Sequence, residues 1–311
     1  MTATILFAGG AARWPHWEAP LRHALSEAGI EAELATSAAP ETVDFIIYAP
    51  SGDTPADFTP FTRCRAVLSL WAGVERIVGN RTLTQPLCRM VDPGLTQGMV
   101  EYVTGHALRY HLGLDAILAA QNGHWNPVVP PLASERPVAM LGLGALGAAC
   151  ARALAGLGFP VLGWSRTPKT LDGIDCHHGE DGLEQVLRRA GIVVTLLPAT
   201  PATENLLDAH RLALLPIGAA IINPGRGSLI DDEALLGALG SGHVGHATLD
   251  VFRTEPLPAE HPYWSHPRVT VTPHIAAETR PDSAARVIAG NIRRGLAGEP
   301  LLHVVDRGAG Y

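Results

Sequence analysis

Residues 138–147 have the sequence Val-Ala-Met-Leu-Gly-Leu-Gly-Ala-Leu-Gly, and helix-forming residues follow as far as 157. A G-x-G-x-x-G spacing between a short apolar strand and a helix is the fingerprint of a dinucleotide-binding turn. The first glycine permits the tight turn, the second lets the backbone approach a pyrophosphate, and the third lets helix and strand pack closely. We therefore expect a Rossmann domain that holds the pyrophosphate at a helix N-terminus, through Gly142, Gly144, Ala145, Leu146 and Gly147.

The end of the next expected strand, residues 161–164, indicates which dinucleotide is bound. Sites that prefer NAD place Asp or Glu there to hold the ribose hydroxyls, but this chain has Trp164-Ser165-Arg166-Thr167. The Arg166 guanidinium is suited to a 2′-phosphate, and Ser165 and Thr167 offer hydroxyl donors. We expect NADP(H) as cofactor, with NAD(H) bound more weakly. Lys169 either adds charge to this site or is a solvated loop lysine.

Two series of short apolar runs alternate with amphipathic stretches, as in parallel sheets with crossover helices. The first series predicts strands at residues 4–8, 31–35, 44–48, 66–70 and 87–91. The second predicts strands at residues 138–141, 161–164, 192–197, 219–223, 247–251 and 269–272. The fold class is α/β with two doubly wound domains, a Rossmann cofactor domain and a flavodoxin-like substrate domain.

The length of 311 residues fits two domains. A long helix at about 99–120 is expected after the turn Asp92-Pro93-Gly94, with a hinge near residue 98. A last helix at about 281–296 lies beyond the second strand series and is expected to fold back onto the first domain. The predicted substrate domain is thus 1–98 with 282–311, and the predicted NADP-binding domain is 99–281.

Composition argues against several classes of function. A net charge of −7 without any basic run gives no footprint for nucleic acid. We expect neither export nor membrane insertion, and a cytoplasmic location, because no basic leader or long apolar segment is present. The four cysteines lack paired spacing, which favours reduced thiols and no metal site. Two histidine pairs are expected to be solvated loop residues, His177 with His178 and His243 with His246.

A second chemical signal is spread over three predicted strand ends, where open α/β sheets bind ligands. These are Asn223-Pro224-Gly225-Arg226-Gly227, the segment from Asp250 to Pro256, and Thr272-Pro273-His274-Ile275-Ala276. Arg226 supplies a planar fork for a carboxylate, His274 a proton donor, and Glu255 an acid that orients the donor and favours its charged form. Together they predict the catalytic set of a 2-keto acid reduction.

With these motifs the sequence resembles the D-isomer-specific 2-hydroxyacid dehydrogenases, and within them the glyoxylate/hydroxypyruvate reductase A branch. Further motifs that carry the resemblance are Leu70-Trp71-Ala72-Gly73-Val74-Glu75, Leu249-Asp250-Val251-Phe252 and His266-Pro267-Arg268-Val269. The resemblance implies that Arg226 holds the substrate, that Glu255 and His274 form the acid/base pair, and that amides of Gly73 and Val74 bind the substrate carboxylate. It also implies a homodimer joined through the cofactor domain, and further cofactor contacts from Leu197, Pro198, Pro224, Gly225, Arg226, Asp250 and His274. For Asp250 this means orienting the nicotinamide amide, with a capping or strand-end role as the alternative.

The expected reaction is hydride transfer from NADPH to glyoxylate or hydroxypyruvate. Two residues depart from the family pattern: Trp71 replaces a common glycine, and Tyr48 replaces a tryptophan of the nearest branch. Each of these two aromatic side chains either lines the substrate pocket or packs in the core. Ala72 is also expected to line the substrate pocket. A bulkier substrate such as an aryl pyruvate, and a non-catalytic dinucleotide sensor, remain as alternatives, and a zinc alcohol dehydrogenase is disfavoured by the cysteine spacing.

Overall fold

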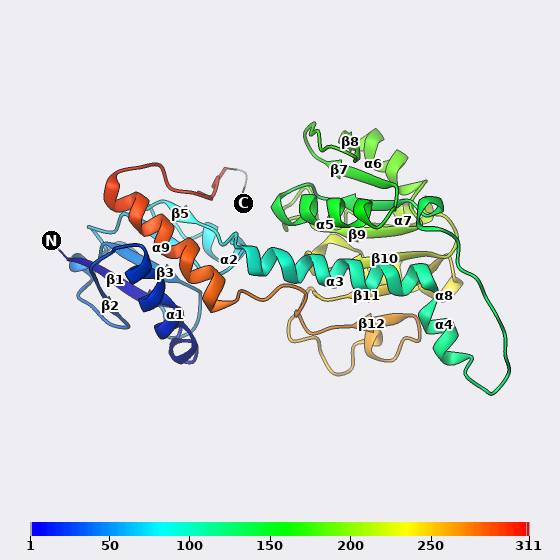
Figure 1. Cartoon of the computed structure of the whole chain (residues 1–311), viewed down its shortest axis with the longest axis horizontal. Coiled ribbons are helices and arrows are strands. Elements are labelled where there is room, and N and C mark those ends of the chain that lie inside the picture. The colour runs from blue at the N-terminus through cyan, green and yellow to red at the C-terminus, as the bar shows by residue number, and fades with distance from the viewer. Residues whose placement is uncertain (1, 309, 311) are drawn as a thin grey trace. The chain divides into compact units, whose positions relative to one another are not determined.

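The computed structural model describes residues 2–308 and 310. They divide into two compact units: the chain up to Leu95 together with the segment from Thr279 on, and Thr96–Glu278. Each unit contains one parallel β-sheet, and Figure 1 follows the chain through both. The predicted α/β class with two doubly wound domains is confirmed.

The first unit has a five-stranded sheet in the order β2-β1-β3-β4-β5, which is the flavodoxin-like order. Its strands are β1 (Ala3–Ala8), β2 (Ala32–Ala35), β3 (Phe45–Tyr48), β4 (Ala66–Ser69) and β5 (Leu87–Cys88). Its helices are α1 (Trp14–Glu27), α2 (Glu75–Val78) and α9 (Pro281–Ala297), with a short 3-10 helix at Pro40–Thr42.

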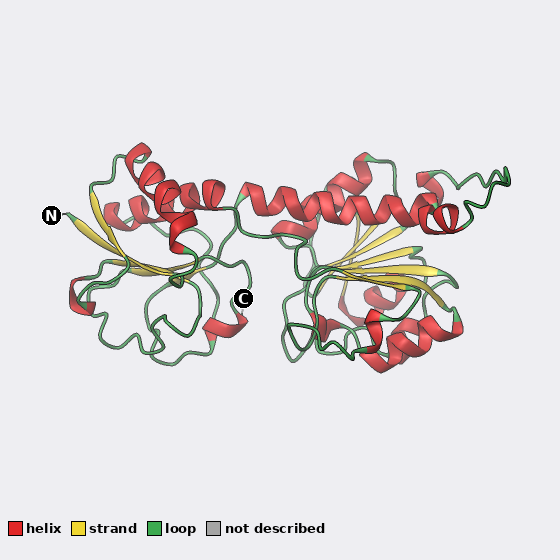
Figure 2. Ribbon diagram, turned by 90° about the horizontal axis from the view of Figure 1, so that it is seen from below, coloured by secondary structure: helices red, strands yellow, loops and turns green. Residues whose placement is uncertain are grey.

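Alternate residues of this sheet point to opposite faces. One face packs against α1 and α9, where Leu21, Ile288 and Ile292 are buried. The other is covered by α2 and by the long loop after β3, through residues such as Phe58 and Ile77. Figure 2 shows these layers from the side.

The second unit has a seven-stranded sheet in the order β12-β11-β10-β9-β6-β7-β8. Read from its far edge, this is the Rossmann order with one added strand. The strands are β6 (Val138–Leu141), β7 (Val161–Ser165), β8 (Asp175–His178), β9 (Ile192–Thr195), β10 (Ala219–Asn223), β11 (Val244–Leu249) and β12 (Val269–Val271).

Helices cover both faces of this sheet (Figure 2). One core lies under α3 (Pro93–Leu112) and α5 (Ala145–Gly156), and the other under α6 (Gly179–Leu187), α7 (Ala209–Ala213) and α8 (Asp232–Ser241). The remaining elements are α4 (Leu114–Ala119) and three short 3-10 helices, Ala133–Glu135, Gly227–Leu229 and Pro262–Trp264.

The start of the long helix was predicted wrongly. Asp92-Pro93-Gly94 is not a turn before the helix but its beginning, because Asp92 Oδ1 accepts hydrogen bonds from the N–H groups of Gly94 (2.8 Å) and Leu95 (3.3 Å). Aspartate before a proline at the first helical position is a favourable N-terminus. The helix also breaks earlier than expected, at Gly113 with φ +67°.

Strand β8 was missed by the sequence analysis, and so were the true positions of two histidines. His177 lies on β8 with only 17% of its side chain exposed, and its Nε2 is 3.1 Å from Asp175 Oδ1. His246 lies on β11, with Nε2 3.0 Å from Thr270 Oγ1. Neither is a solvated loop residue.

Candidate active site

The glycine loop between β6 and α5 is built so that two of its positions exclude any side chain. Gly142 has φ +108°, and a Cβ there would lie 2.3 Å from the carbonyl oxygen of Leu196. A Cβ at Gly147 would lie 1.8 Å from the carbonyl oxygen of Gly142. A Cβ at Gly144, by contrast, would meet nothing within 4 Å, so this backbone is open to close approach. Helix α5 begins at Ala145, which directs its first N–H groups toward this opening.

The segment after β7 contacts the same glycine loop. Lys169 Nζ donates a hydrogen bond of 2.8 Å to the carbonyl oxygen of Leu143, inside the glycine loop. The lysine thus braces the loop and brings a positive charge to it, which distinguishes it from a solvated loop lysine. Arg166 and Thr167 are exposed at the end of β7, whereas Ser165 is buried and its Oγ donates to the Thr167 carbonyl oxygen at 2.9 Å.

Trp164, Leu197 and Pro198 were also predicted to contact the cofactor, and they are more buried than Arg166 and Thr167. The ring of Trp164 is packed in the core, and its Nε1 donates to the carbonyl oxygen of Gly179 at 2.8 Å. Its side chain therefore anchors β7 to the start of α6. Leu197 and Pro198 are half-buried just beyond the end of β9.

Arg226 lies in a turn held by a buried amide. Asn223, at the end of β10, is 1% exposed. Its Nδ2 donates to the carbonyl oxygen of Arg226 (2.9 Å), while its Oδ1 accepts from Thr195 Oγ1 (2.7 Å) and Gly225 N (3.1 Å). A Cβ at Gly227 would lie 2.1 Å from the carbonyl carbon of Phe252, so the turn is also closed against the neighbouring loop.

His274 and Glu255 are brought into contact from two loops. His274 Nδ1 lies 2.8 Å from Glu255 Oε2, with the histidine side chain 55% exposed and the glutamate side chain 36% exposed. The other carboxylate oxygen, Oε1, accepts a hydrogen bond from Phe252 N at 2.9 Å. The glutamate is therefore fixed on one side and orients the histidine with the other, which leaves Nε2 as the ring nitrogen not bound by Glu255.

Asp250 holds the backbone that carries His274. It is 1% exposed, its Oδ1 accepts from Thr272 Oγ1 (2.7 Å) and Ile275 N (2.9 Å), and its Oδ2 accepts from Ala276 N (2.9 Å). His274 itself adopts φ +55°, a conformation unusual for a residue other than glycine. These contacts favour the strand-end role that the sequence analysis kept as the alternative for Asp250.

Of the substrate residues predicted in the first unit, Tyr48 lies in the core and the others lie in or next to the loop after β4. Tyr48 is 6% exposed, its ring packs edge-on against Phe58, and its hydroxyl donates to the Pro55 carbonyl oxygen at 3.0 Å. It is a core residue, and burial raises the pKa of its hydroxyl. Trp71, Ala72 and Gly73 are half-buried in the loop after β4, and Val74 lies directly before α2.

Residues 107–276 match the family model described as the NAD-binding domain of D-isomer-specific 2-hydroxyacid dehydrogenases. The chain belongs to this family. It is 38% identical over 283 residues to a glyoxylate/hydroxypyruvate reductase A of Serratia proteamaculans, with 85% of this chain and 90% of that protein covered. The family resemblance predicted from the sequence is thereby confirmed.

Two solved structures are similar to this chain over its whole length. A D-isomer-specific 2-hydroxyacid dehydrogenase from Xanthobacter autotrophicus Py2, crystallised with NADPH and MES, is 40% identical, with a TM-score of 0.91 and 100% of both chains covered. An NADPH-dependent glyoxylate/hydroxypyruvate reductase from Sinorhizobium meliloti, in complex with NADP and sulfate, is 32% identical. Its TM-score is 0.84, covering 100% of this chain and 99% of that one.

The sequence analysis missed the residues that hold this dehydrogenase's site side chains in place. Asn223 was quoted only as part of a motif, and Thr195 was placed only on a strand. Their contact joins residues 28 positions apart, so no local spacing reveals it. The one available signal was an amide directly before a Pro-Gly turn, a position that favours side-chain hydrogen bonds to the backbone.

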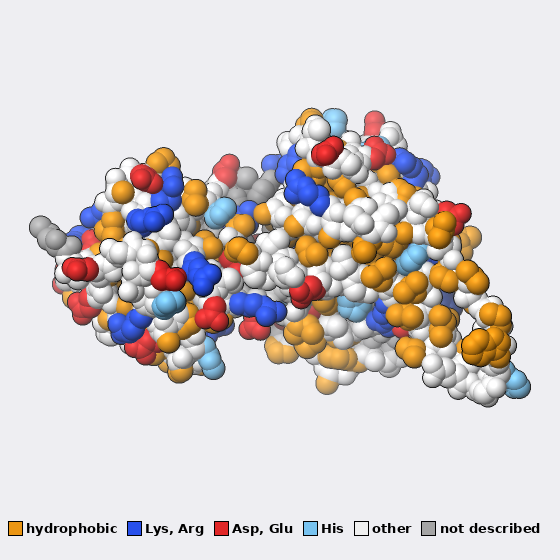
Figure 3. Space-filling model, in the orientation of Figure 1, with side chains coloured by type: hydrophobic (Ala, Val, Ile, Leu, Met, Phe, Trp, Pro, Cys, Tyr) orange, Lys and Arg blue, Asp and Glu red, His pale blue; other side chains and the backbone are white. Residues whose placement is uncertain are grey.

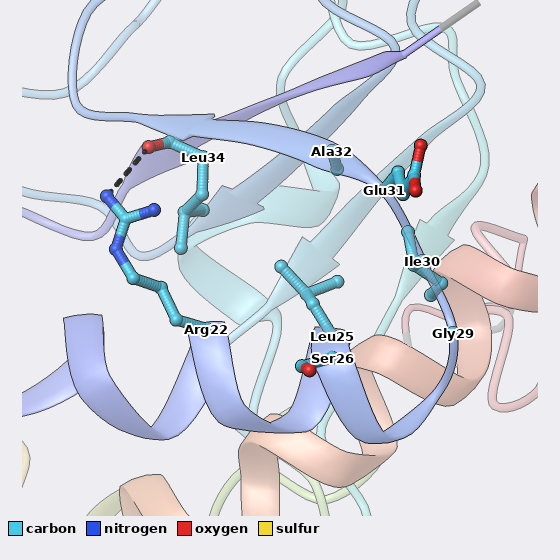
Figure 4. Close-up of a pocket in the computed structure, with 8 residues that line it drawn as sticks. All are labelled: Arg22, Leu25, Ser26, Gly29, Ile30, Glu31, Ala32 and Leu34. Atoms are coloured by element: carbon cyan, nitrogen blue, oxygen red, sulfur yellow. Dashed lines mark hydrogen bonds between the residues drawn. The ribbon is translucent and has the colours of Figure 1, made fainter.

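A hollow on the first unit lies away from all these residues. It is formed by the end of α1 and the start of β2, and Figure 4 shows the Arg22 guanidinium turned toward the Leu34 carbonyl oxygen at 3.4 Å. This is the amino edge of a parallel sheet, whereas ligands of such sheets bind at the carboxyl edge. We assign the hollow no role in the dehydrogenase reaction.

Among the residues that the structure describes, no helix is both long and apolar enough to span a bilayer. Nowhere in residues 2–308 and 310 do three or more His, Cys, Asp or Glu side chains gather as metal ligands would.

Proposed function

We propose that this protein is an NADPH-dependent reductase of small 2-keto acids, of the glyoxylate or hydroxypyruvate type. The observation that carries the proposal is the His274–Glu255 contact of 2.8 Å at the carboxyl edge of the Rossmann sheet, in a chain whose relatives bear the names of such reductases. A histidine oriented by a carboxylate is the arrangement that a proton donor to a developing alkoxide requires.

The residues of the glycine loop fit a dinucleotide. Gly142 and Gly147 close the turn, Gly144 leaves the backbone open, and α5 begins directly behind it. Arg166 is exposed beyond β7, where a family member would bind the adenosine ribose, and no carboxylate occupies residues 164–167. We propose that Arg166 and Lys169 favour NADP(H), with NAD(H) bound more weakly.

In the proposed mechanism Arg226 binds the substrate carboxylate through its planar guanidinium. Backbone amides of Gly73 and Val74 are proposed as further carboxylate ligands, as the family resemblance implies. When bound, the reduced nicotinamide supplies the hydride that adds to the keto carbon. His274 donates a proton from Nε2 to the keto oxygen as the C=O bond becomes a C–O–H group, and Glu255 stabilises the protonated ring before transfer.

Steady-state oxidation of NADPH and NADH with glyoxylate, hydroxypyruvate, pyruvate and phenylpyruvate tests the proposal. We expect turnover with the small acids, a preference for NADPH, a large fall in kcat in His274→Ala, and a raised KM in Arg226→Ala. His23→Ala, in an exposed helical pair with Glu27, is the matched control. Tight NADPH binding without turnover of any keto acid would instead indicate a dinucleotide sensor, and the best rates with phenylpyruvate would indicate an aryl pyruvate reductase.

We also propose a homodimer formed through the second unit. The segment from Leu112 to Leu132, which contains α4 and the loop after it, exposes many large apolar side chains. Figure 3 shows apolar side chains, in orange, gathered over α4 and this loop. The large apolar side chains exposed in this segment are Leu112, Leu114, Ile117, Leu118, Trp125, Val128, Val129 and Leu132. Contiguous exposed apolar surface of this kind is typical of protein interfaces. Light scattering should give twice the chain mass, and Trp125→Glu should shift the protein toward the monomer.

A further inference from the structure

Arg253 lies two residues before Glu255, in the loop after β11, and its side chain contacts two other loops of the second unit. Its Nη1 donates to Glu204 Oε1 and its Nη2 to Asn205 Oδ1, both in the segment after β9. Nη2 also donates to the carbonyl oxygen of Ile230 at 2.8 Å, in the segment after β10. Strands β9, β10 and β11 are neighbours in the sheet, so one guanidinium joins the loops at three adjacent strand ends.

A carboxylate of α8 completes the surroundings of this guanidinium. Arg253 Nε lies 3.6 Å from Asp232 Oδ2, while Asp232 Oδ1 accepts a hydrogen bond from the Tyr263 hydroxyl at 2.9 Å. A guanidinium presents several N–H donors in a planar fork, which lets it serve acceptors from different segments at once. Arg253 is therefore suited to hold backbone segments at fixed positions.

The segments after β9 and β10 are also joined to each other without Arg253. Asn205 N donates to the carbonyl oxygen of Ser228 at 2.8 Å. Leu207 N donates to the carbonyl oxygen of Leu229 at 2.9 Å. Removal of the Arg253 side chain would leave these bonds in place, so we expect it to release the loop after β11 from a support that stays intact.

The loop after β11 carries the carboxylate that orients His274. Phe252 N donates to Glu255 Oε1 at 2.9 Å, so the position of this carboxylate depends on the backbone at Phe252. The same backbone packs closely on the segment after β10, since a Cβ at Gly227 would lie 2.4 Å from Arg253 N. The Arg253 side chain adds polar contacts to this packing and ties Glu255 to its neighbours on both sides.

We propose that Arg253 is a positioning residue, which holds Glu255, and through it the ring of His274, at a fixed place relative to the turn of Arg226. This inference rests on the proposed function, since it concerns the acid/base pair of that reductase. Arg253 touches neither substrate nor cofactor in this proposal and acts only through Glu255. A residue that supported folding alone would lower stability without a selective loss of kcat.

Arg253→Gln tests this role, because it keeps a polar side chain but removes the charge and the planar fork. We expect kcat for glyoxylate with NADPH to fall about tenfold, less than the cost of a full 1 Å misplacement. KM for glyoxylate and the affinity for NADPH should change by less than about twofold, because the turn of Arg226 and the glycine loop keep their own hydrogen bonds.

The matched control is Arg136→Gln. Arg136 is a half-buried arginine of the same unit that donates to the Tyr110 carbonyl oxygen at 3.0 Å, just before β6. It lies at the amino edge of the sheet, so its loss should leave kcat as in the wild type.

A double variant shows whether Arg253 acts through Glu255. In Glu255→Ala the carboxylate that Arg253 positions is gone, so adding Arg253→Gln should lower kcat by less than about twofold further. A general structural role would lower kcat by the same factor with and without Glu255.

A second variant approaches the same contacts from the opposite side. Glu204→Gln/Asn205→Gly weakens two acceptors of Arg253, and glycine accepts the φ of +49° that Asn205 adopts. We expect kcat to fall about threefold, since the Ile230 carbonyl oxygen and Asp232 remain as partners. An unchanged kcat here would overturn the inference even if Arg253→Gln did not fold.

The outcomes separate the two proposals. Turnover of glyoxylate by the wild type with an equal kcat in Arg253→Gln would overturn this inference and leave the proposed function standing. So would an equal fall of kcat in Arg136→Gln, or the same factor in the Glu255→Ala background. Absence of NADPH oxidation with every keto acid would overturn the proposed function and, with it, the role of Arg253.

Discussion

The carboxyl edges of the two sheets hold their candidate site residues by different means. In the second unit, buried polar groups fix the backbone around each site residue: Asn223 holds the turn of Arg226, and Asp250 holds the loop of His274. In the first unit, the guanidinium groups of Arg13 and Arg76 lie over the half-buried ring of Trp71. Because buried hydrogen bonds hold the backbone in the second unit, we expect substitutions of these buried groups to change reaction rates and stability more than substitutions of the cation–π contacts of the first unit.

The largest effect is expected at the glycine loop, the most constrained part of the second unit. In Gly147→Ala the new Cβ would meet the Gly142 carbonyl oxygen at 1.8 Å, so strand and helix must separate. We expect affinity for NADPH, measured by fluorescence titration, to fall by roughly 100-fold, because displacement of about 1 Å has costs of that order.

The matched control for this substitution is Gly156→Ala at the end of the same helix. A Cβ there would meet nothing within 4 Å, so alanine should raise stability by about 0.5–1 kcal/mol and leave NADPH affinity unchanged. Equal NADPH affinities in the two variants would show that the close contact at Gly147 does not set the shape of the loop.

The next effect concerns the buried carboxylate behind His274. Asp250→Ala leaves Ile275 N and Ala276 N without their acceptor, which should destabilise the protein by roughly 3 kcal/mol. The released loop should also lower kcat by about 10² at saturating substrate, with little change in NADPH affinity if Asp250 acts mainly through the loop. Asp172→Ala, at an exposed loop position, should change neither. An unaltered kcat in Asp250→Ala would contradict a positioning role.

The glycine loop and the pairing of Glu255 with His274 could be predicted because their signals are local, whereas the role of Arg226 stays a prediction. A strand, a turn of fixed spacing and a helix follow one another within twenty residues, and strand ends mark where side chains gather. The supporting contacts could not be predicted, since Asp250 and Ala276 meet across 26 positions of sequence. Strand β8 was missed because it is a polar edge strand without apolar alternation.

Residues of the first unit show the limit of sequence reasoning most clearly. From the sequence, Tyr48 and Trp71 could each lie in the core or line a pocket, and only tertiary packing distinguishes the two residues. Tyr48 is 6% exposed and packs against Phe58, whereas Trp71 is half-buried under two guanidinium groups. Arg13 and Arg76 are distant in sequence and each is an ordinary surface arginine when taken alone. Their convergence depends on sheet order, which the strand pattern does not specify at the level of side chains.

A smaller effect is expected when the amide behind Arg226 is removed. Asn223→Ala takes away the donor to the Arg226 carbonyl oxygen and the acceptor of Thr195 Oγ1 and Gly225 N. Of these three hydrogen bonds, loss of the one to Arg226 should weaken its positioning by about 1.4 kcal/mol, so KM for glyoxylate should rise about tenfold. Asn122→Ala, in an exposed loop, is the control. A raised KM in both variants would show that the effect is not specific to the Arg226 turn.

The smallest effect comes from polar groups that the second unit buries under α3, and it appears as a pH dependence of stability. Burial lowers the pKa of His246 to about 4, with a further contribution from Arg109, while Asp115 opposes the shift and His266 and His106 add to it. The folded-state pKa lies below the unfolded value of about 6.5, so the unfolded chain binds more protons between these limits. The stability is fully present above pH 6.5 and is lost as the pH falls toward 4.

Urea unfolding at pH 7.5 and pH 5 measures this loss. Because the His246 side chain is only half-buried, we expect a loss of about 1 kcal/mol after discounting for solvent screening. His246→Gln keeps a polar partner for Thr270 Oγ1 and should reduce the loss, whereas His210→Gln, an exposed histidine, should leave it as in the wild type. An identical pH dependence in the wild type and in His246→Gln would place the acid sensitivity elsewhere, and the histidines under α3 would then contribute packing rather than charge.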